Sequence, residues 1–217
     1  MNLFKVEKLD LLVSLYIFCI AASEFAGAKT IPLFKVFGYQ LNSSVAIITV
    51  PLVYAVNDIL TEVYGKNRAR SVVRSGLLVV LLIFVFSLIA TSLPPSGRFI
   101  KSNPAYNTVF GLSARISAAS FTAFAVAEFL DVFIFAKLRQ SLGKKNLWLR
   151  TNASNFISQF VDTGLFMVLA FYAIDKPIGA NISFLVSLII PYWIIKCAAS
   201  IIETPLVYAG VRFLKDK

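Results

Sequence analysis

Residues 74–93 read RSGLLVVLLIFVFSLIATSL, a run of twenty positions with one charged side chain, Arg74, at its start. Hydrophobic residues fill most of the other positions, without the alternation of polar and apolar residues that marks a half-buried strand. A helix of about twenty apolar residues is long enough to cross the hydrocarbon core of a membrane. This segment therefore predicts a transmembrane helix.

Similar stretches recur along the whole chain. Of its 217 residues, 58% are hydrophobic, which exceeds the roughly 45–50% of soluble domains. Continuous apolar runs favour helices over a membrane β-barrel, whose strands alternate. We predict an all-α integral membrane protein in which residues 1–217 form a single domain, a bundle of six transmembrane helices. The predicted spans are 10–31, 44–64, 74–93, 114–137, 152–174 and 183–213.

Basic residues are unevenly distributed among the predicted loops. Six spans place both termini on one side, and that side carries fourteen Lys and Arg residues against six on the other. Because positively charged loops stay in the cytoplasm, we expect both termini there, in a multi-pass membrane protein. The net charge of +10 is explained by this distribution, so the lipid bilayer is expected as a partner and nucleic acid is not.

The sequence does not contain the residues that several kinds of chemistry require. The chain has no histidine and only two cysteines, Cys19 and Cys197, both within predicted spans. Most zinc chemistry and the usual imidazole proton relay are thereby excluded. The chain also lacks a GxxxxGK[ST] P-loop and a GxSxG elbow, so no nucleotide hydrolysis of that kind is expected. We predict no metal site, no cofactor and no enzymatic activity, with an intramembrane enzyme as the remote alternative.

Ionisable residues nevertheless occur inside the predicted spans. Each costs at least about 2.5–3.5 kcal/mol at the centre of a membrane helix, so each suggests a function. Thr151, Asn155, Ser158 and Asp162 follow the spacing i, i+4, i+7, i+11, a single polar stripe with Gln159 beside it. Seven acidic residues and one lysine within the spans are the candidates: Glu24, Asp58, Glu62, Glu128, Asp131, Asp162, Glu203 and Lys196.

Three other predicted spans also carry polar residues on one face, at Asp58 and Glu62, at Glu128 and Asp131, and at Lys196 and Glu203. Polar stripes on four helices cannot all face lipid, so we expect them to converge on a polar pocket. Interhelical hydrogen bonds alone are the alternative. Lys196 is expected to be a charged, paired lysine, with Glu203 two turns away on the same helix face as the nearest partner in the sequence. The candidate binding residues are Tyr54, Asn57, Asp58, Asp131, Asn155, Gln159, Asp162, Lys196 and Glu203.

The residue types in this pocket suit a planar heterocycle rich in hydrogen-bond donors. Ionised carboxylates accept hydrogen bonds, and amide side chains both donate and accept. A guanine-like edge presents a ring N–H next to an amino group, and one carboxylate can accept from both. An inorganic cation is the competing use of the same oxygens. Flat apolar surfaces are supplied by Tyr16, Phe25, Phe34, Tyr54, Phe156, Phe160, Tyr192 and Trp193.

The segment NDILTEVYGK at residues 57–66 resembles the signature that follows the second span of the queuosine precursor transporters, the vitamin-uptake-transporter-like family. Leu130-Asp131-Val132 is similar to an element on that family's fourth span. Arg150-Thr-Asn152 with Ser158-Gln-Phe-Val-Asp162, and Lys196 with Glu203-Thr-Pro-Leu206, also match its pattern. The resemblance covers nearly the whole chain.

The resemblance implies a multi-pass protein of the bacterial inner membrane that imports 7-cyano-7-deazaguanine or its 7-aminomethyl relative, precursors of the modified tRNA base queuosine. It also implies a six-helix fold similar to the substrate-binding subunits of energy-coupling-factor vitamin transporters. The residues leave the energy source open. A secondary transporter would use protons or sodium, a binding subunit for another vitamin-like molecule would need a separate ATPase, and facilitated diffusion would need neither.

Overall fold

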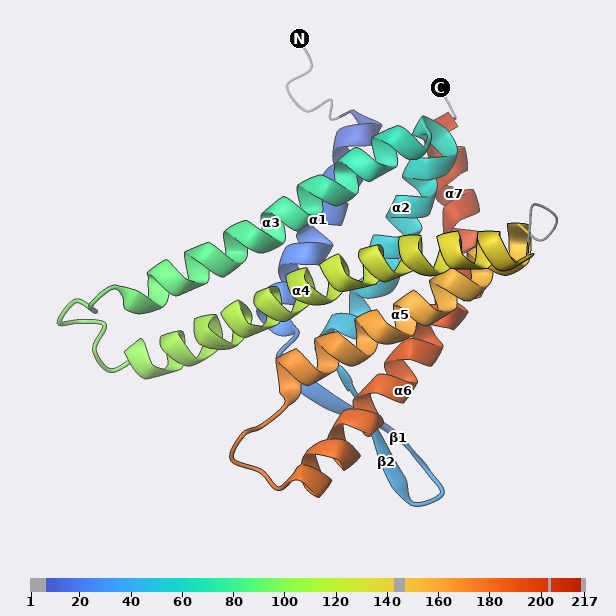
Figure 1. The fold of residues 1–217 in the computed structure, drawn as a ribbon. Helices are drawn as coiled ribbons and strands as arrows, with labels where there is room; N and C mark the ends of the chain where they lie inside the picture. The colour runs from blue at the N-terminus through green and yellow to red at the C-terminus, as the bar shows by residue number, and fades with distance from the viewer. Residues whose placement is uncertain (1–6, 143–146, 203, 216–217) are drawn as a thin grey trace, which may run out of the picture. The chain divides into compact units, whose positions relative to one another are not determined.

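The structure is a computed structural model that describes residues 7–142, 147–202 and 204–215. Side chains are described over the same ranges except at positions 66, 128, 131–132, 135–136, 138–142, 147–155, 197–202, 204–207, 213 and 215. The elements in order are α1 (Lys8–Ala26), β1 (Thr30–Val36), β2 (Tyr39–Ser44), η1 (Val45–Ile48), α2 (Val50–Tyr64), α3 (Lys66–Ser92), α4 (Asn103–Leu142), α5 (Leu147–Phe171), α6 (Ile178–Ile202) and α7 (Thr204–Lys215) (Figure 1).

Five helical segments of the described chain are long and apolar enough to cross a membrane: Lys8–Ala26, Val45–Tyr64, Asn67–Ser92, Asn103–Ala127 and Ile178–Lys196. Phe156–Phe171, within α5, is a shorter apolar helix. The prediction of a helical membrane protein is confirmed. The count of six spans stays a prediction, because α5 does not reach the spanning length over its described side chains.

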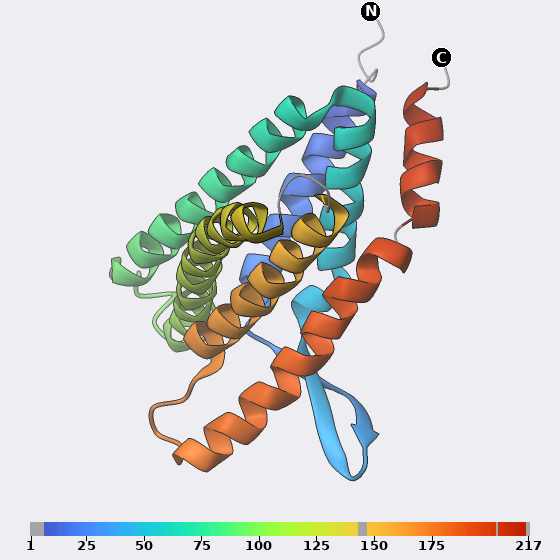
Figure 2. The same cartoon turned by 45° about the vertical axis from the view of Figure 1, so that its right-hand side comes forward.

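The predicted last span, 183–213, contains residue 203, which lies outside the described residues, so its continuity as a single helix stays a prediction. The described residues on either side of it are helical, in α6 up to Ile202 and in α7 from Thr204 (Figure 2). Pro191 lies inside α6 without ending it.

The predicted first span, 10–31, is wrong at its end. Helix α1 stops at Ala26, and a β-hairpin of β1 and β2 begins at Thr30, so the all-α prediction misses one small sheet. The turn consists of Phe37 (φ 49°) and Gly38 (φ 82°). Two consecutive residues with positive φ match the tight turn whose twist suits antiparallel strands.

The chain folds into two compact units. Unit 1 comprises residues 1–30, 44–117 and 198–217, and unit 2 comprises residues 31–43 and 118–197. Unit 1 therefore contains α1, α2, α3, the first part of α4 and α7. Unit 2 contains the hairpin, the rest of α4, α5 and most of α6.

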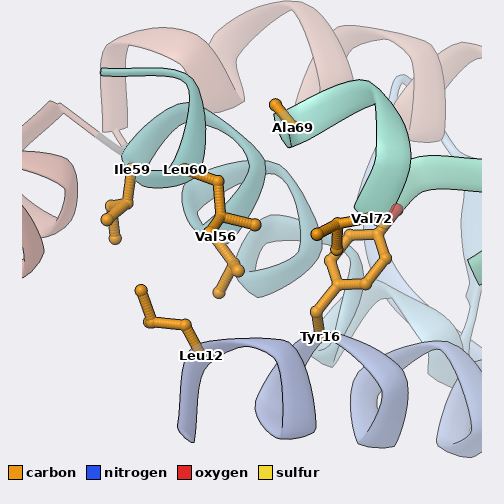
Figure 3. Close-up of a cluster of buried hydrophobic side chains, with 7 residues drawn as sticks. All are labelled: Leu12, Tyr16, Val56, Ile59, Leu60, Ala69 and Val72. Carbon is orange, nitrogen blue, oxygen red and sulfur yellow. The ribbon is translucent and has the colours of Figure 1, made fainter. Parts of the chain in front are cut away.

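Unit 1 is built around one apolar cluster from α1, α2 and α3. Its buried members are Leu12, Tyr16, Val56, Ile59, Leu60, Ala69 and Val72 (Figure 3). Val211 and Leu214 of α7 pack against this cluster. Gly76 lets α3 approach α1, since a methyl group there would lie 2.6 Å from Ile20 Cδ1 and 2.8 Å from Tyr16 Cε1. Without a hydrophobic effect inside the bilayer, such close packing is what joins membrane helices.

In unit 2, polar side chains join the hairpin to α6. The Tyr39 hydroxyl donates to the Ser183 carbonyl, and Asn42 Nδ2 lies 2.9 Å from Ser187 Oγ, so the hairpin contacts the first half of α6. Buried Asn181 closes the connection between α5 and α6. Its Oδ1 accepts from the Ala173 N–H at 2.9 Å and its Nδ2 donates to the Ala173 carbonyl at 2.8 Å.

Candidate functional site

The polar stripe predicted on residues 151–162 lies within the continuous helix α5, which runs from Leu147 to Phe171. Ser158 is buried and Gln159 is half-buried. Thr163, next to the stripe, is fully buried. The helical spacing of the stripe is confirmed by the backbone, while the side chains of Thr151 and Asn155 lie outside the described residues.

An ion pair joins the stripe to α6. Lys196 Nζ lies 2.6 Å from Asp162 Oδ2, and the two side chains are 10% and 26% exposed. The ammonium also lies 5.6 Å from the centre of the Tyr192 ring, within the range of a cation–π contact. The prediction of a paired Lys196 is confirmed, and the described partner is Asp162 on the neighbouring helix.

The expected pairing of Lys196 with Glu203 rested on one uninterrupted helix face. The pairing stays a prediction, because α6 is described up to Ile202 and α7 from Thr204. Glu203 itself lies outside the described residues.

Aromatic rings adjoin the ion pair. The Trp193 ring, one turn before Lys196 on α6, contacts Phe156 at 4.5 Å between ring centres and Phe160 at 5.3 Å. Both contacts are edge-on, with interplanar angles of 64° and 76°, an arrangement that aromatic pairs favour. Each phenylalanine keeps about half of its surface exposed, 51% for Phe156 and 47% for Phe160. That apolar surface can be covered by a planar ligand or by lipid.

The remaining predicted residues are distributed over both units. Tyr54 and Asn57 are half-buried on α2 of unit 1, and Asp58 beside them is exposed. The Asn57 carbonyl accepts from the Thr61 hydroxyl at 2.8 Å. Asp131 lies on the α4 backbone in unit 2, but its side chain is outside the described residues. The structure thus brings together Asp162 and Lys196, with Gln159 on the same helix, and the convergence of all four stripes stays a prediction.

Sequence reasoning left some polar groups out of the candidate site. Glu24 of α1 was noted as an acid inside a span, and it is 5% exposed. Beside it, the Ser23 and Thr49 hydroxyls lie 2.6 Å apart and join α1 to the start of α2. Thr163 gave no signal, because a single threonine in an apolar helix is ordinary. Over the described part of the chain, no three acidic or cysteine side chains gather as ligands for a metal ion.

Comparison with known proteins gives these residues a context. Residues 44–210 match the model of a family described as "Putative vitamin uptake transporter". The chain belongs to this family. It is therefore a transporter and not an enzyme, and the prediction of a multi-pass protein of the bacterial inner membrane is confirmed.

Three relatives carry a more specific name. A "Probable queuosine precursor transporter" of Bacillus subtilis is 28% identical over 206 residues, covering 94% of this chain and 86% of the relative. One from Haemophilus influenzae is 27% identical, covering 76% and 71%. A "Queuosine precursor transporter" of Escherichia coli is 32% identical, covering 56% and 52%. No solved structure matches the chain.

Proposed function

We propose that this protein imports a queuosine precursor, 7-cyano-7-deazaguanine or its 7-aminomethyl relative, and binds it beside the Asp162–Lys196 ion pair. The pair carries the proposal. Asp162 is a part-buried carboxylate in contact with Lys196, and a ligand with hydrogen-bond donors could take the place of that partner. Support also comes from the names of the three relatives, which all refer to queuosine precursors.

The ion pair suggests how a deazaguanine binds to Asp162. Its ring N–H and amino group are adjacent donors, and one carboxylate can accept from both. These donors would compete with the Lys196 ammonium for the oxygens of Asp162. Because removing one partner from a buried pair is costly, a ligand that replaces Lys196 must keep the Asp162 oxygens hydrogen-bonded, which two adjacent donors can do. The displaced ammonium would stay close to the Tyr192 ring, which already lies 5.6 Å away.

The rest of the proposed site follows from the sequence stripes. Phe156, Phe160 and Trp193 would stack against the faces of the heterocycle. Asp131, Asn155 and Gln159 are the other residues of unit 2 that the sequence predicts for this pocket.

We also propose six spans with both termini in the cytoplasm. Leu12 near the start of α1, Ala69 near the start of α3 and Leu214 near the end of α7 all belong to or pack on one cluster. These helix ends therefore meet at one end of unit 1, and all three carry basic residues. A cysteine at exposed Arg70 should resist a membrane-impermeant thiol reagent in intact cells, whereas one at the hairpin tip, Phe37, should react. The reverse pattern would overturn this topology.

Uptake into liposomes tests the function itself. Purified protein should accumulate radiolabelled 7-cyano- or 7-aminomethyl-7-deazaguanine, and proton, sodium or no imposed gradient would reveal the energy source. Asp162→Asn should bind the ligand roughly ten- to a hundredfold more weakly, since it loses a charge-assisted hydrogen bond, while still inserting and folding. If the parent protein binds neither compound, the proposed function is wrong. If Asp162→Asn binds like the parent, only the assignment of this carboxylate is wrong.

A further inference from the structure

The indole N–H of Trp193 is buried, and no described residue accepts a hydrogen bond from it. An indole nitrogen can only donate, and its direction is fixed by the ring. Unlike a hydroxyl, it cannot rotate toward another acceptor. Buried donors in proteins almost always have a partner, so a fixed, unpaired donor requires an explanation.

A second unpaired polar atom lies on the helix face that Trp193 contacts. Phe156, Phe160 and Thr163 follow the spacing i, i+4, i+7 and therefore share one side of α5. Thr163 is fully buried, and its hydroxyl has no partner among the described residues. Other helical hydroxyls, such as those of Ser113 and Thr122, donate to the carbonyl four residues earlier. The hydroxyl of Thr163 does not use that arrangement.

These two groups lie next to the ion pair. Lys196 follows Trp193 by three residues on α6, so both side chains project from the same side of that helix. Asp162, which pairs with Lys196, precedes Thr163 directly and follows Phe160 by two residues. Trp193 and Lys196 thus share one side of α6, and both contact α5, Trp193 through two aromatic rings and Lys196 through Asp162.

We infer that Trp193 recognises the 6-oxo group of the ligand, donating its indole N–H to that oxygen while Asp162 accepts from the adjacent ring N–H. This inference rests on the proposed function, because it concerns the same ligand. An acceptor and a donor side by side form a lactam edge, and guanine-like rings present one. An adenine-like ring presents an amino donor at the corresponding position. Two donors would then face each other at Trp193, and the adjacent ring nitrogen, which carries no hydrogen in such a ring, would face the Asp162 carboxylate. Trp193 and Asp162 therefore both disfavour 6-amino compounds.

Thr163 has a different role in this arrangement. A hydroxyl can donate or accept, so it can satisfy either kind of ring substituent. We assign it as a second polar contact that adds affinity without selecting between 6-oxo and 6-amino rings.

The test compares 7-cyano-7-deazaguanine with the otherwise identical compound that has a 6-amino group, using calorimetry on the full-length protein. The parent should prefer the 6-oxo compound by roughly a hundredfold or more, because a buried polar group that loses its partner is strongly penalised. Trp193→Phe keeps the ring and removes the N–H. It should lose roughly tenfold in affinity for the 6-oxo compound, about 1.4 kcal/mol, and nothing for the 6-amino compound.

Two further variants separate the roles. Thr163→Val should weaken both compounds by similar factors, leaving the preference intact. Trp148→Phe removes the only other tryptophan of the chain and should change neither affinity. Melting temperatures of all variants distinguish a lost contact from a lost fold.

Each result bears on the inference. If Trp193→Phe keeps the full preference for the 6-oxo compound, a water molecule satisfies the indole and the inference falls, while the proposed function stands. If Trp193→Phe does not fold, the parent still decides, because a parent without preference between the two compounds overturns the inference. A parent that binds neither compound overturns the proposed function and, with it, this reading of Trp193.

Discussion

In unit 1 the contacts between helices are mostly between hydrocarbon groups, as where Leu60 of α2 packs among side chains of α1 and α3. In unit 2 an ion pair, hydrogen bonds and aromatic ring contacts join distant segments. Asp162 pairs with Lys196, Asn42 bonds to Ser187, and Asn181 bonds to Ala173. Unit 1 also contains the hydroxyl contact of Ser23 with Thr49, so the difference is one of degree.

The two kinds of contact respond differently to a ligand. Apolar packing of closely spaced helices offers a polar molecule no exchangeable partner. A hydrogen bond or ion pair can be replaced by an equivalent bond to a ligand without leaving a buried group unsatisfied. The comparison therefore favours unit 2, where the proposed binding site lies, as the part of the protein that responds to the ligand, and it favours a supporting role for the cluster of unit 1.

The largest effect is expected at Lys196. Lys196→Met removes the ammonium and leaves Asp162 without its described partner, which should lower the free energy of unfolding by about 3–5 kcal/mol. Transport should be lost as well, because the pair would no longer be exchanged by the ligand. Thermal melting in detergent and liposome uptake measure the two effects separately.

A charge-reversed double variant is the matched control for that experiment. Asp162→Lys combined with Lys196→Asp can restore an ion pair and therefore much of the stability. It should not restore transport, because the carboxylate then projects from α6 in place of α5. Normal uptake by the double variant would mean that the pair only joins the helices.

Leu60→Ala tests the apolar side of the comparison. Leu60 is fully buried in the cluster of unit 1, and its truncation should lower the free energy of unfolding by about 2–5 kcal/mol. Ligand affinity of the folded fraction should not change. Leu52→Ala, at an exposed position of the same helix, should have little effect on either quantity. A large loss of affinity in folded Leu60→Ala would contradict the supporting role of unit 1.

The smallest of the three effects is expected at Asn181. Asn181→Ala removes the side chain that bonds to the N–H and the carbonyl of Ala173. We expect a loss of about 1–3 kcal/mol, since buried backbone groups become unsatisfied. Affinity should be nearly unchanged, because the connection is remote in sequence from Asp162 and Lys196. Equal losses of affinity in Asn181→Ala and Asp162→Asn would show that unit 2 responds as a whole.

The membrane helices could be predicted because continuous hydrophobicity is a local property of the sequence. The hairpin could not, since its turn, Phe37-Gly38, contains only one of the residues that usually favour positive φ. Pro191 lies inside α6 without ending it. Whether the carbonyl that a proline frees can be accommodated depends on its surroundings, which the sequence does not encode locally.

The ion pair shows the same limit for the candidate site. Sequence spacing indicated that Lys196 is paired, because an isolated ammonium inside a membrane is costly. Spacing along one helix, however, identifies only partners on that helix, and it selected Glu203. Asp162 is 34 residues away on α5, so its pairing with Lys196 depends on how α5 packs against α6. The sequence also gives no indication that the Trp193 indole N–H lacks an acceptor among the described residues.

Helix α6 does not stop where unit 2 stops. Unit 2 ends at Cys197, yet α6 continues to Ile202, and α4 likewise passes from unit 1 into unit 2 between Ser117 and Ala118. A helix, whose backbone is hydrogen-bonded along its length, bends less easily than a loop. Lys196 is one residue from the boundary within α6, so the proposed change of its partner would act where this helix passes from one unit into the other.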